Sequence, residues 1–313
     1  MINTAIITGA SGFIGSTLAN YLLKNNFKVI ALGRKSFSEI RLSRLVANKN
    51  LIYLKVDMKD INNLKYIIEK NKITITKNSY FFHFAWGGEN VLSDLNVKAQ
   101  LKNVIWTRDA FNVSEEIGIK KFIFVGTMEE KFAKKYLNLN HKKDNFYNRH
   151  VIYALAKLAA RNTLKTIYHN KKIKLIFATN SHVMGPKDER DSFLQTTLKK
   201  IILKEDLLLA PCDKYFDVIS SYDCARAYKL IGEKGEHMKE YWVGSGEPKI
   251  LQEYVKIMSE MYSYDKDLNF NGININEIPL SKSDFSIADL VKDTGFKIKM
   301  SFQDTVKQLA KSL

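Results

Sequence analysis

The sequence has little of what defines disulfide-rich, fibrous or membrane proteins. Its two cysteines, Cys212 and Cys224, are too few for a disulfide framework and lack the Cys/His spacing of a zinc site. With 4 Pro, 15 Gly and 45% hydrophobic residues among 313, the chain should be neither disordered nor fibrous. No apolar run approaches the roughly 18 residues that suggest a membrane span, and no signal peptide precedes the first apolar segment. We therefore expect a soluble, cytoplasmic protein without a metal site.

A basic block is also lacking, although 49 Lys+Arg outnumber 33 Asp+Glu and the net charge is +16. Nucleic-acid-binding proteins show a similar excess. Here the lysines are scattered through every segment, and pairs such as Lys134-Lys135 and Lys142-Lys143 are typical of solvated helix ends and loops. No helix-turn-helix, zinc-finger or RNA-binding aromatic motif accompanies them. The charge therefore favours a lysine-rich globular protein with no nucleic-acid partner.

Short apolar runs alternate with segments of helical periodicity from the first residue onward, which is typical of a parallel sheet covered by helices on both faces. The fold class predicted is α/β, a doubly wound Rossmann sheet with a smaller C-terminal lobe. Residues 1–179 plus 214–245 would bind a dinucleotide, and 180–213 plus 246–313 would bind the substrate. The expected strands are Thr4 to Thr8, Lys28 to Gly33, Ile52 to Val56, Tyr80 to Ala85, Phe122 to Gly126, Lys174 to Thr179 and Tyr241 to Val243.

The sharpest local motif is a GxxGxxG between the first expected strand and the first expected helix. Glycines at this place permit a tight turn and let backbone N–H groups approach a pyrophosphate at the positive end of the helix dipole. The position after a strand and before a helix distinguishes this motif from a structural glycine turn. The predicted cofactor-binding residues here are Gly9, Ser11, Gly12, Phe13, Ile14 and Gly15.

The end of the second expected strand bears on which dinucleotide is bound. An acidic residue there would bind the ribose hydroxyls of NAD, whereas the sequence reads Gly33-Arg34-Lys35. Arg34 can pair with a 2′-phosphate, so NADP(H) is favoured over NAD(H); the alternative is that Arg34 is a solvated loop residue. Asp57 and Met58, after the third expected strand, are predicted to meet the adenine.

With these features the chain resembles the extended short-chain dehydrogenase/reductase family, which includes nucleotide-sugar epimerases, dehydratases and ketoreductases. The resemblance spans essentially the whole length and rests also on Phe82-His83-Phe84-Ala85, Asn96, Thr127 and Tyr153-Ala154-Leu155-Ala156-Lys157. It implies that Thr127, Tyr153 and Lys157 are catalytic. It further implies that Phe84, Ala85, Lys157 and Asn180 contact the cofactor and that the protein is a homodimer. We expect His83 to be a core histidine or one that supports the site from behind, without contacting a ligand.

Tyr-x-x-x-Lys occurs four times, and position selects the pair at 153 and 157, which follows the fifth expected strand. The other pairs, expected on surface helices, are Tyr66/Lys70, Tyr168/Lys172 and Tyr262/Lys266. Residues four apart share a helix face, so we expect Lys157 to lower the pKa of the Tyr153 phenol. Tyr153 would then exchange a proton with a carbonyl or alcohol.

The segment after Thr127 discriminates among members of the family. The resemblance implies a sequence like Thr-Asp-Glu at this place in the dehydratases, with the Asp as the acid. This sequence reads Thr127-Met128-Glu129, and a methionine side chain cannot protonate a leaving group. Glu129, His182 and Arg190 are the predicted substrate-binding residues. The resemblance is nearest to nucleotide-sugar 4-ketoreductases of the CDP-abequose synthase type, which act in surface-polysaccharide sugar biosynthesis. The alternatives are a nucleotide-sugar C4 epimerase with tightly bound NAD and, more remotely, a non-enzymatic regulator that senses the cofactor.

Overall fold

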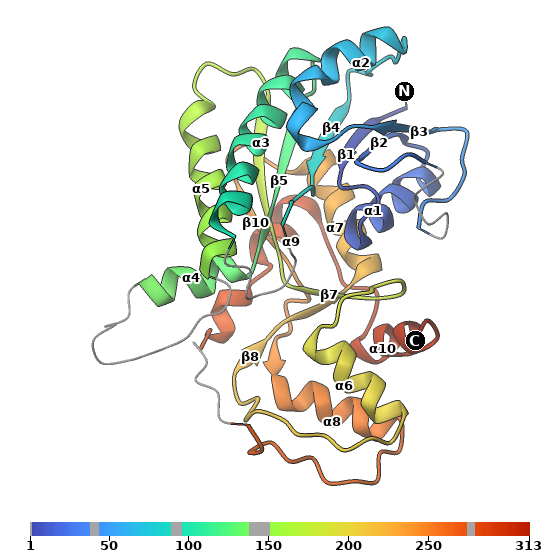
Figure 1. The fold of residues 1–313 in the computed structure, drawn as a ribbon, viewed down its shortest axis with the longest axis vertical. Helices are drawn as coiled ribbons and strands as arrows, with labels where there is room; N and C mark the ends of the chain where they lie inside the picture. Colours follow the sequence, from blue (N-terminus) through green and yellow to red (C-terminus); the bar gives the residue numbers. More distant parts are fainter. Residues whose placement is uncertain (1, 38–43, 89–95, 138–150, 274–278) are drawn as a thin grey trace.

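A seven-stranded parallel sheet forms the centre of the computed structural model, which describes residues 2–37, 44–88, 96–137, 151–273 and 279–313 (Figure 1). The strand order is β10-β6-β5-β4-β1-β2-β3. The chain therefore starts in the middle of the sheet, builds one half, and crosses back beside β1 to build the other. The strands are β1 (Thr4–Thr8), β2 (Lys28–Gly33), β3 (Leu51–Lys55), β4 (Ser79–His83), β5 (Lys121–Thr127), β6 (Lys174–Asn180) and β10 (Glu240–Val243).

Helices cover both faces of this sheet because the central strands carry apolar side chains on both faces. Ala5 and Ile7 of β1 pack toward α1 (Phe13–Lys24) and α7 (Ser221–Lys234), whereas Ile6 packs toward the other layer. That second layer contains α3 and α5, which lie side by side, together with α2 and the 3₁₀ helix η1 (Figure 1). Their bounds are α3 (Val97–Glu116), α5 (Val151–Ile167), α2 (Leu64–Lys70) and η1 (Met58–Asn63). The doubly wound α/β fold predicted from the sequence is confirmed.

The expected strands match the observed ones closely, and the largest difference is at the end of β4. The sequence predicts a strand that continues to Ala85, but β4 ends at His83. The backbone N–H of Ala85 donates to Thr8 Oγ1 at 3.1 Å instead of joining the ladder. The chain is thereby turned across the carboxyl end of β1.

A second lobe lies below the carboxyl edge of the sheet (Figure 1). Its apolar core joins residues from 184–218 and 254–309. Leu290 and Phe296 belong instead to the core of the sheet, so the C-terminal segment serves both parts; the domain division drawn above remains a prediction. The remaining elements are α4 (Glu129–Leu137), β7 (His182–Met184), α6 (Phe193–Ile202), β8 (Tyr215–Phe216), β9 (Val218–Ser220), β11 (Lys249–Ile250), α8 (Leu251–Met261), η2 (Lys282–Phe285), α9 (Ala288–Thr294) and α10 (Phe302–Ala310).

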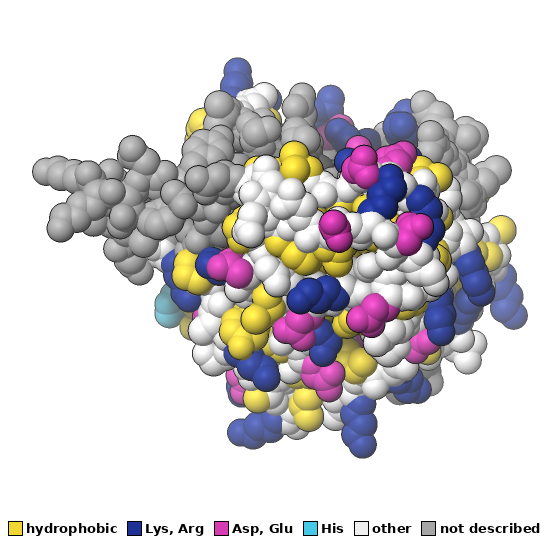
Figure 2. All heavy atoms as spheres, turned by 90° about the horizontal axis from the view of Figure 1, so that it is seen from below, with side chains coloured by type: hydrophobic (Ala, Val, Ile, Leu, Met, Phe, Trp, Pro, Cys, Tyr) yellow, Lys and Arg dark blue, Asp and Glu magenta, His cyan; other side chains and the backbone are white. Residues whose placement is uncertain are grey.

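Charged side chains of both signs are interspersed over the lower face of the molecule. Figure 2 shows Lys and Arg alternating there with Asp and Glu and with apolar side chains. On the described part of this face the basic side chains do not merge into one continuous surface. The arrangement agrees with a compositional origin of the lysine excess.

Candidate active site

The glycine-rich turn connects β1 to α1 at the carboxyl edge of the sheet and leaves no room for a side chain at positions 9 and 15. Gly9 has φ +67°, and a Cβ there would lie 2.9 Å from the Ala85 nitrogen. A Cβ on Gly15 would fall far inside van der Waals contact with the Gly9 carbonyl oxygen. The N-cap of α1 is Gly12, which provides no side-chain cap, and the first turn contains no acidic residue. The turn is thus a bare backbone cradle at a positive helix end, which fits a dinucleotide pyrophosphate.

The predicted adenosine-side residues lie along the same edge. Arg34 follows the last residue of β2 and is exposed, without an ion-pair partner among the described residues. Asp57 caps η1 by accepting the Lys59 N–H at 3.1 Å, which occupies one of its oxygens. Met58 is buried in the core between the sheet and the α3 layer. Asp57 therefore has a structural task in addition to any contact with adenine.

Sequence reasoning missed Arg44, which also lies against the glycine turn. Its Nη1 donates to the Ser11 carbonyl at 3.2 Å, and its Nη2 is 3.0 Å from Glu189 Oε2. No motif in the sequence marks this arginine. Only the fold brings it to residue 11.

Arg190 was predicted to bind substrate, and the structure places it between the lobe and the cofactor turn. It forms a two-pronged pair with Asp188 and donates to the Val183 carbonyl at 2.8 Å. Its guanidinium carbon lies 5.3 Å from the centre of the Phe13 ring. Its positive charge opposes, as the smallest of several effects, the rise in the pKa of Tyr153.

The predicted catalytic residues converge at the end of β5. The Thr127 side chain lies close enough to the Tyr153 phenol to counteract part of the rise in its pKa. Lys157, one turn further along α5, is buried, and its ammonium donates to the Val125 carbonyl at 2.8 Å. The three residues therefore come from one strand end and one helix face, as the spacing predicts.

The electrostatics of this group differ from the expectation that Lys157 lowers the pKa of Tyr153. The pKa of Tyr153 is raised, because burial outweighs the lowering effect of Thr127, while Glu129 and Glu130 raise it further. The Lys157 ammonium lies 6.0 Å from the Tyr153 ring centre but only 3.9 Å from that of Trp86. Burial also lowers the pKa of Lys157 to about 7.

Trp86 is a second residue that sequence reasoning missed. Its indole packs edge-on to Tyr153, with ring centres 6.0 Å apart, and its N–H donates to Gln100 Oε1 at 2.8 Å. It thus fixes one wall of the space around Tyr153 and Lys157. Its place three residues after His83, where β4 ends, is the signal that could have found it.

Of the residues around the end of β4, some stabilise the fold and others line the candidate site. His83 is buried, its Nδ1 lies 3.0 Å from Thr8 Oγ1 and its Nε2 lies 3.1 Å from Thr107 Oγ1. Burial lowers its pKa to about 3, so it stays neutral. This agrees with the expected core histidine. Phe84 packs edge-on to Tyr228, and Ala85 lies against Gly9 in the turn.

The opposite side of the site is formed by the end of β6 and by β7. The Asn180 side-chain oxygen accepts the Tyr228 hydroxyl at 2.7 Å, which leaves its amide nitrogen for other contacts. Burial lowers the pKa of His182 to about 3, and its buried Nε2 has no hydrogen-bond partner among the described residues. Glu129 is half-buried at the start of α4. Met128, at the position where an acidic residue is expected in a dehydratase, is buried in a small apolar cluster with Trp242 and Phe285.

The other Tyr-x-x-x-Lys pairs lie elsewhere. Tyr66 and Lys70 are on α2, where Tyr66 is 62% exposed. Tyr168 and Tyr262 each follow the last residue of a helix, so the expectation of surface helices was wrong for these two pairs. None of the three reaches the carboxyl edge of the sheet.

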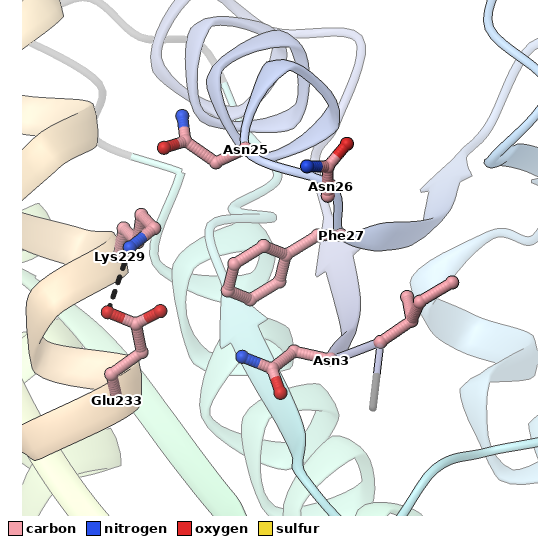
Figure 3. A pocket seen from close by; sticks show the side chains of 7 residues that line it. Asn3, Asn25, Asn26, Phe27, Lys229 and Glu233 are labelled. Atoms are coloured by element: carbon pink, nitrogen blue, oxygen red, sulfur yellow. Dashed lines mark hydrogen bonds and ion pairs between the residues drawn. The ribbon is translucent and has the colours of Figure 1, made fainter.

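One surface depression is remote from this site. It is lined by Asn3, Phe27, Lys229 and neighbouring residues at the amino ends of β1 and β2, and Lys229 pairs with Glu233 one turn further along α7, on one wall (Figure 3). Ligands of doubly wound sheets bind at the opposite, carboxyl edge. Within the described ranges, no three His, Cys, Asp or Glu residues are grouped to hold a metal, and no helix is long and apolar enough to span a membrane.

Residues 5–244 match the NAD dependent epimerase/dehydratase family. The chain belongs to this family. It is 25% identical over 264 residues to a dTDP-D-glucose 4,6-dehydratase of Dictyostelium discoideum, covering 78% of the chain and 58% of that protein. It is 20% identical to the CDP-abequose synthase of Salmonella muenchen, covering 97% of the chain and 96% of that protein.

Several solved structures have a similar fold and align with nearly the whole of this chain. UDP-glucose 4-epimerase from Thermotoga maritima superposes with a TM-score of 0.72 at 20% identity, over 99% of the chain and 98% of its own. UDP-N-acetylglucosamine 4-epimerase from Methanobrevibacter ruminantium gives 0.76 at 20% identity, over all of both chains. WbmF from Bordetella bronchiseptica, solved with NADH, gives 0.76 at 15% identity, over 99% and 91%. At these identities the likeness establishes the fold.

Proposed function

We propose that the protein is an NADP(H)-dependent oxidoreductase that reduces a 4-keto, often 6-deoxy, nucleotide-linked sugar in surface-polysaccharide sugar biosynthesis. The observation that carries this proposal is the convergence of Thr127, Tyr153 and Lys157 at the carboxyl edge of the sheet beside the glycine cradle. Met128 argues against dehydration, because it is packed in an apolar cluster and has no titratable group. The resemblance to CDP-abequose synthase over nearly the whole chain points the same way.

Each catalytic side chain has a defined role in this proposal. Tyr153 donates a proton to the sugar carbonyl oxygen, and Thr127 donates a hydrogen bond to the same oxygen. The Lys157 cation stabilises the phenolate that forms and binds the ribose next to the nicotinamide. The bound dinucleotide supplies the hydride to the carbonyl carbon. Because burial raises the pKa of free Tyr153, the positive charge of Lys157 and Arg190 must reach the phenol in the productive complex.

The proposal also assigns the binding residues. The glycine turn holds the pyrophosphate, Arg34 binds the 2′-phosphate, Asp57 and Met58 meet the adenine, and Phe84, Ala85 and Asn180 line the nicotinamide side. Glu129 and His182 face the sugar across Tyr153, with Arg190 between sugar and cofactor. The second lobe would close over the nucleotide sugar.

The second candidate is a nucleotide-sugar C4 epimerase with tightly bound NAD. Two similar solved structures are UDP-sugar 4-epimerases, and the same Thr/Tyr/Lys set serves an oxidation followed by a reduction. A regulator that only senses the cofactor would not need this set, so we place it last.

We also propose that the protein forms a homodimer through α3 and α5. Val97, Leu101 and Ile105 lie four residues apart on α3 and are each about half exposed, and Leu155 is 37% exposed on the neighbouring α5. An apolar stripe of this kind on adjacent helices suits a four-helix contact between two copies.

One experiment separates the enzymatic candidates. The purified protein is incubated with NADPH and a panel of 4-keto nucleotide sugars, and the absorbance of the reduced cofactor is followed. Substrate-dependent oxidation of NADPH supports the reductase. Interconversion of UDP-sugars with no added cofactor and no net oxidation would reject it in favour of the epimerase.

A further inference from the structure

A buried ion pair lies directly behind the catalytic residues. Arg161 Nε on α5 is 2.6 Å from Glu130 Oε2 on α4, and both side chains are 4% exposed. Burying two charges costs several kcal/mol for each ion, and apolar replacements of similar volume are often neutral or stabilising. Stability alone therefore gives no reason for the pair.

The remaining atoms of the pair tie together the strand ends that carry the site. Glu130 Oε1 accepts the backbone N–H of Thr127 at 2.9 Å. Arg161 Nη2 donates to Thr179 Oγ1 at 2.9 Å, on the strand paired with β5. The ends of β5 and β6 and two helices are thus joined through one guanidinium and one carboxylate.

The space for this pair depends on Gly126, the residue before Thr127. A Cβ at position 126 would lie 2.5 Å from Arg161 Nη2 and 3.1 Å from Thr179 Oγ1, and still closer to Glu130 Oε1. The rings of Phe124 and Phe177 enclose the guanidinium, at 5.6 and 5.2 Å from its carbon. The pair is a built feature of this sheet edge.

We propose that Glu130 and Arg161 are positioning residues that hold Thr127 in register with Tyr153 and set the electrostatic field at Lys157. This inference rests on the proposed catalytic set. Neither side chain contacts substrate or cofactor in it. They act through the backbone of Thr127 and through charge.

The groups around Lys157 determine how a change in the Glu130–Arg161 pair should alter the pKa of Lys157. Facing its ammonium are the Val125 carbonyl, the rings of Trp86 and Phe124, neutral His83, the Tyr153 phenol and the two charges of the pair. Burial lowers the pKa of Lys157 to about 7; Glu130 raises that pKa and Arg161 lowers it further. Removing the negative charge of Glu130 should therefore lower the pKa, so that less of Lys157 is cationic at neutral pH.

The test compares Glu130→Gln with Glu240→Gln. Glu240 is the second carboxylate near Arg161, with Oε2 3.4 Å from Nη1, and it does not bond to Thr127. For Glu130→Gln we expect kcat to fall about ten- to a hundredfold, as for a slightly misplaced catalytic group, with KM for the sugar nearly unchanged. The descending limb of the pH–rate profile should move to lower pH. Glu240→Gln should retain wild-type kcat and pH profile.

A readout without substrate keeps this inference separate from the proposed reaction. NADPH affinity is titrated from acid to alkaline pH in the wild type and both variants. If the loss of NADPH affinity with rising pH occurs at lower pH in Glu130→Gln alone, the inference is supported, even if no sugar is turned over. The same pH dependence of NADPH affinity in all three proteins, or a change in Glu130→Gln that is confined to thermal stability, would overturn it. If Glu130→Gln does not fold, Gly126→Ala displaces the pair without deleting a charge; unchanged kcat and unchanged Thr127 amide exchange in that variant would equally overturn it.

Discussion

The glycine cradle makes the most direct structural prediction, through Gly15→Ala. The added Cβ would collide with the Gly9 carbonyl oxygen and lie 3.0 Å from Gly9 C and 3.2 Å from Ala10 Cα. All three atoms are backbone, so no side chain can swing away and the turn itself must open. Overpacking of this kind costs about 1–3 kcal/mol. If that cost falls on the cofactor-bound turn, binding weakens about five- to 150-fold.

The assay is a fluorescence titration of NADPH, with thermal unfolding measured in parallel. Gly118→Ala is the matched control, because Gly118 has φ +78° but nothing within 4 Å of an added Cβ. Its cost, about 1–2 kcal/mol of backbone strain, should lower Tm and leave the NADPH Kd unchanged. Wild-type NADPH affinity in Gly15→Ala would refute the assignment of this turn to the pyrophosphate.

Three further predictions concern the catalytic and cofactor residues. Tyr153→Phe should lower kcat by about 10²- to 10⁴-fold, the usual worth of a general acid, with NADPH affinity intact; near-normal turnover in stopped-flow assays would reject the site. Arg34→Ala should weaken NADPH more than NADH, and equal losses in paired titrations would contradict a 2′-phosphate contact. Since burial lowers the pKa of Lys157 to about 7 and the cation binds the ribose, NADPH affinity should fall as pH rises through that value; Lys157→Met should abolish this dependence.

Local sequence was sufficient to predict the layers of the fold. The strands of the sheet are apolar on both faces, and the helical segments between them are amphipathic, so a parallel sheet between two helical layers follows from burial alone. The end of β4 could not be placed in this way. Whether Ala85 continues the strand depends on the Thr8 hydroxyl, 77 residues earlier in the chain.

The candidate site shows the same division between near and distant residues. Tyr153 and Lys157 are four residues apart on one helix, and their pairing with Thr127 follows from the order of strand and helix. Arg44 reaches Ser11 from 33 residues away, and Arg161 reaches Glu130 from 31 residues away. No periodicity signals such contacts, because each depends on how loops and helix ends meet at one edge of the sheet.

The sequence by itself determined the doubly wound sheet, the glycine turn and the helix face that carries Tyr153 and Lys157, since each rests on burial or on spacing along one element. Only the tertiary structure decided their electrostatics. Burial raises the pKa of Tyr153 and lowers that of Lys157, because both lie in a space closed by Trp86 and backed by the Glu130–Arg161 pair. Desolvation and charge act through distance in space, which the order of residues does not contain.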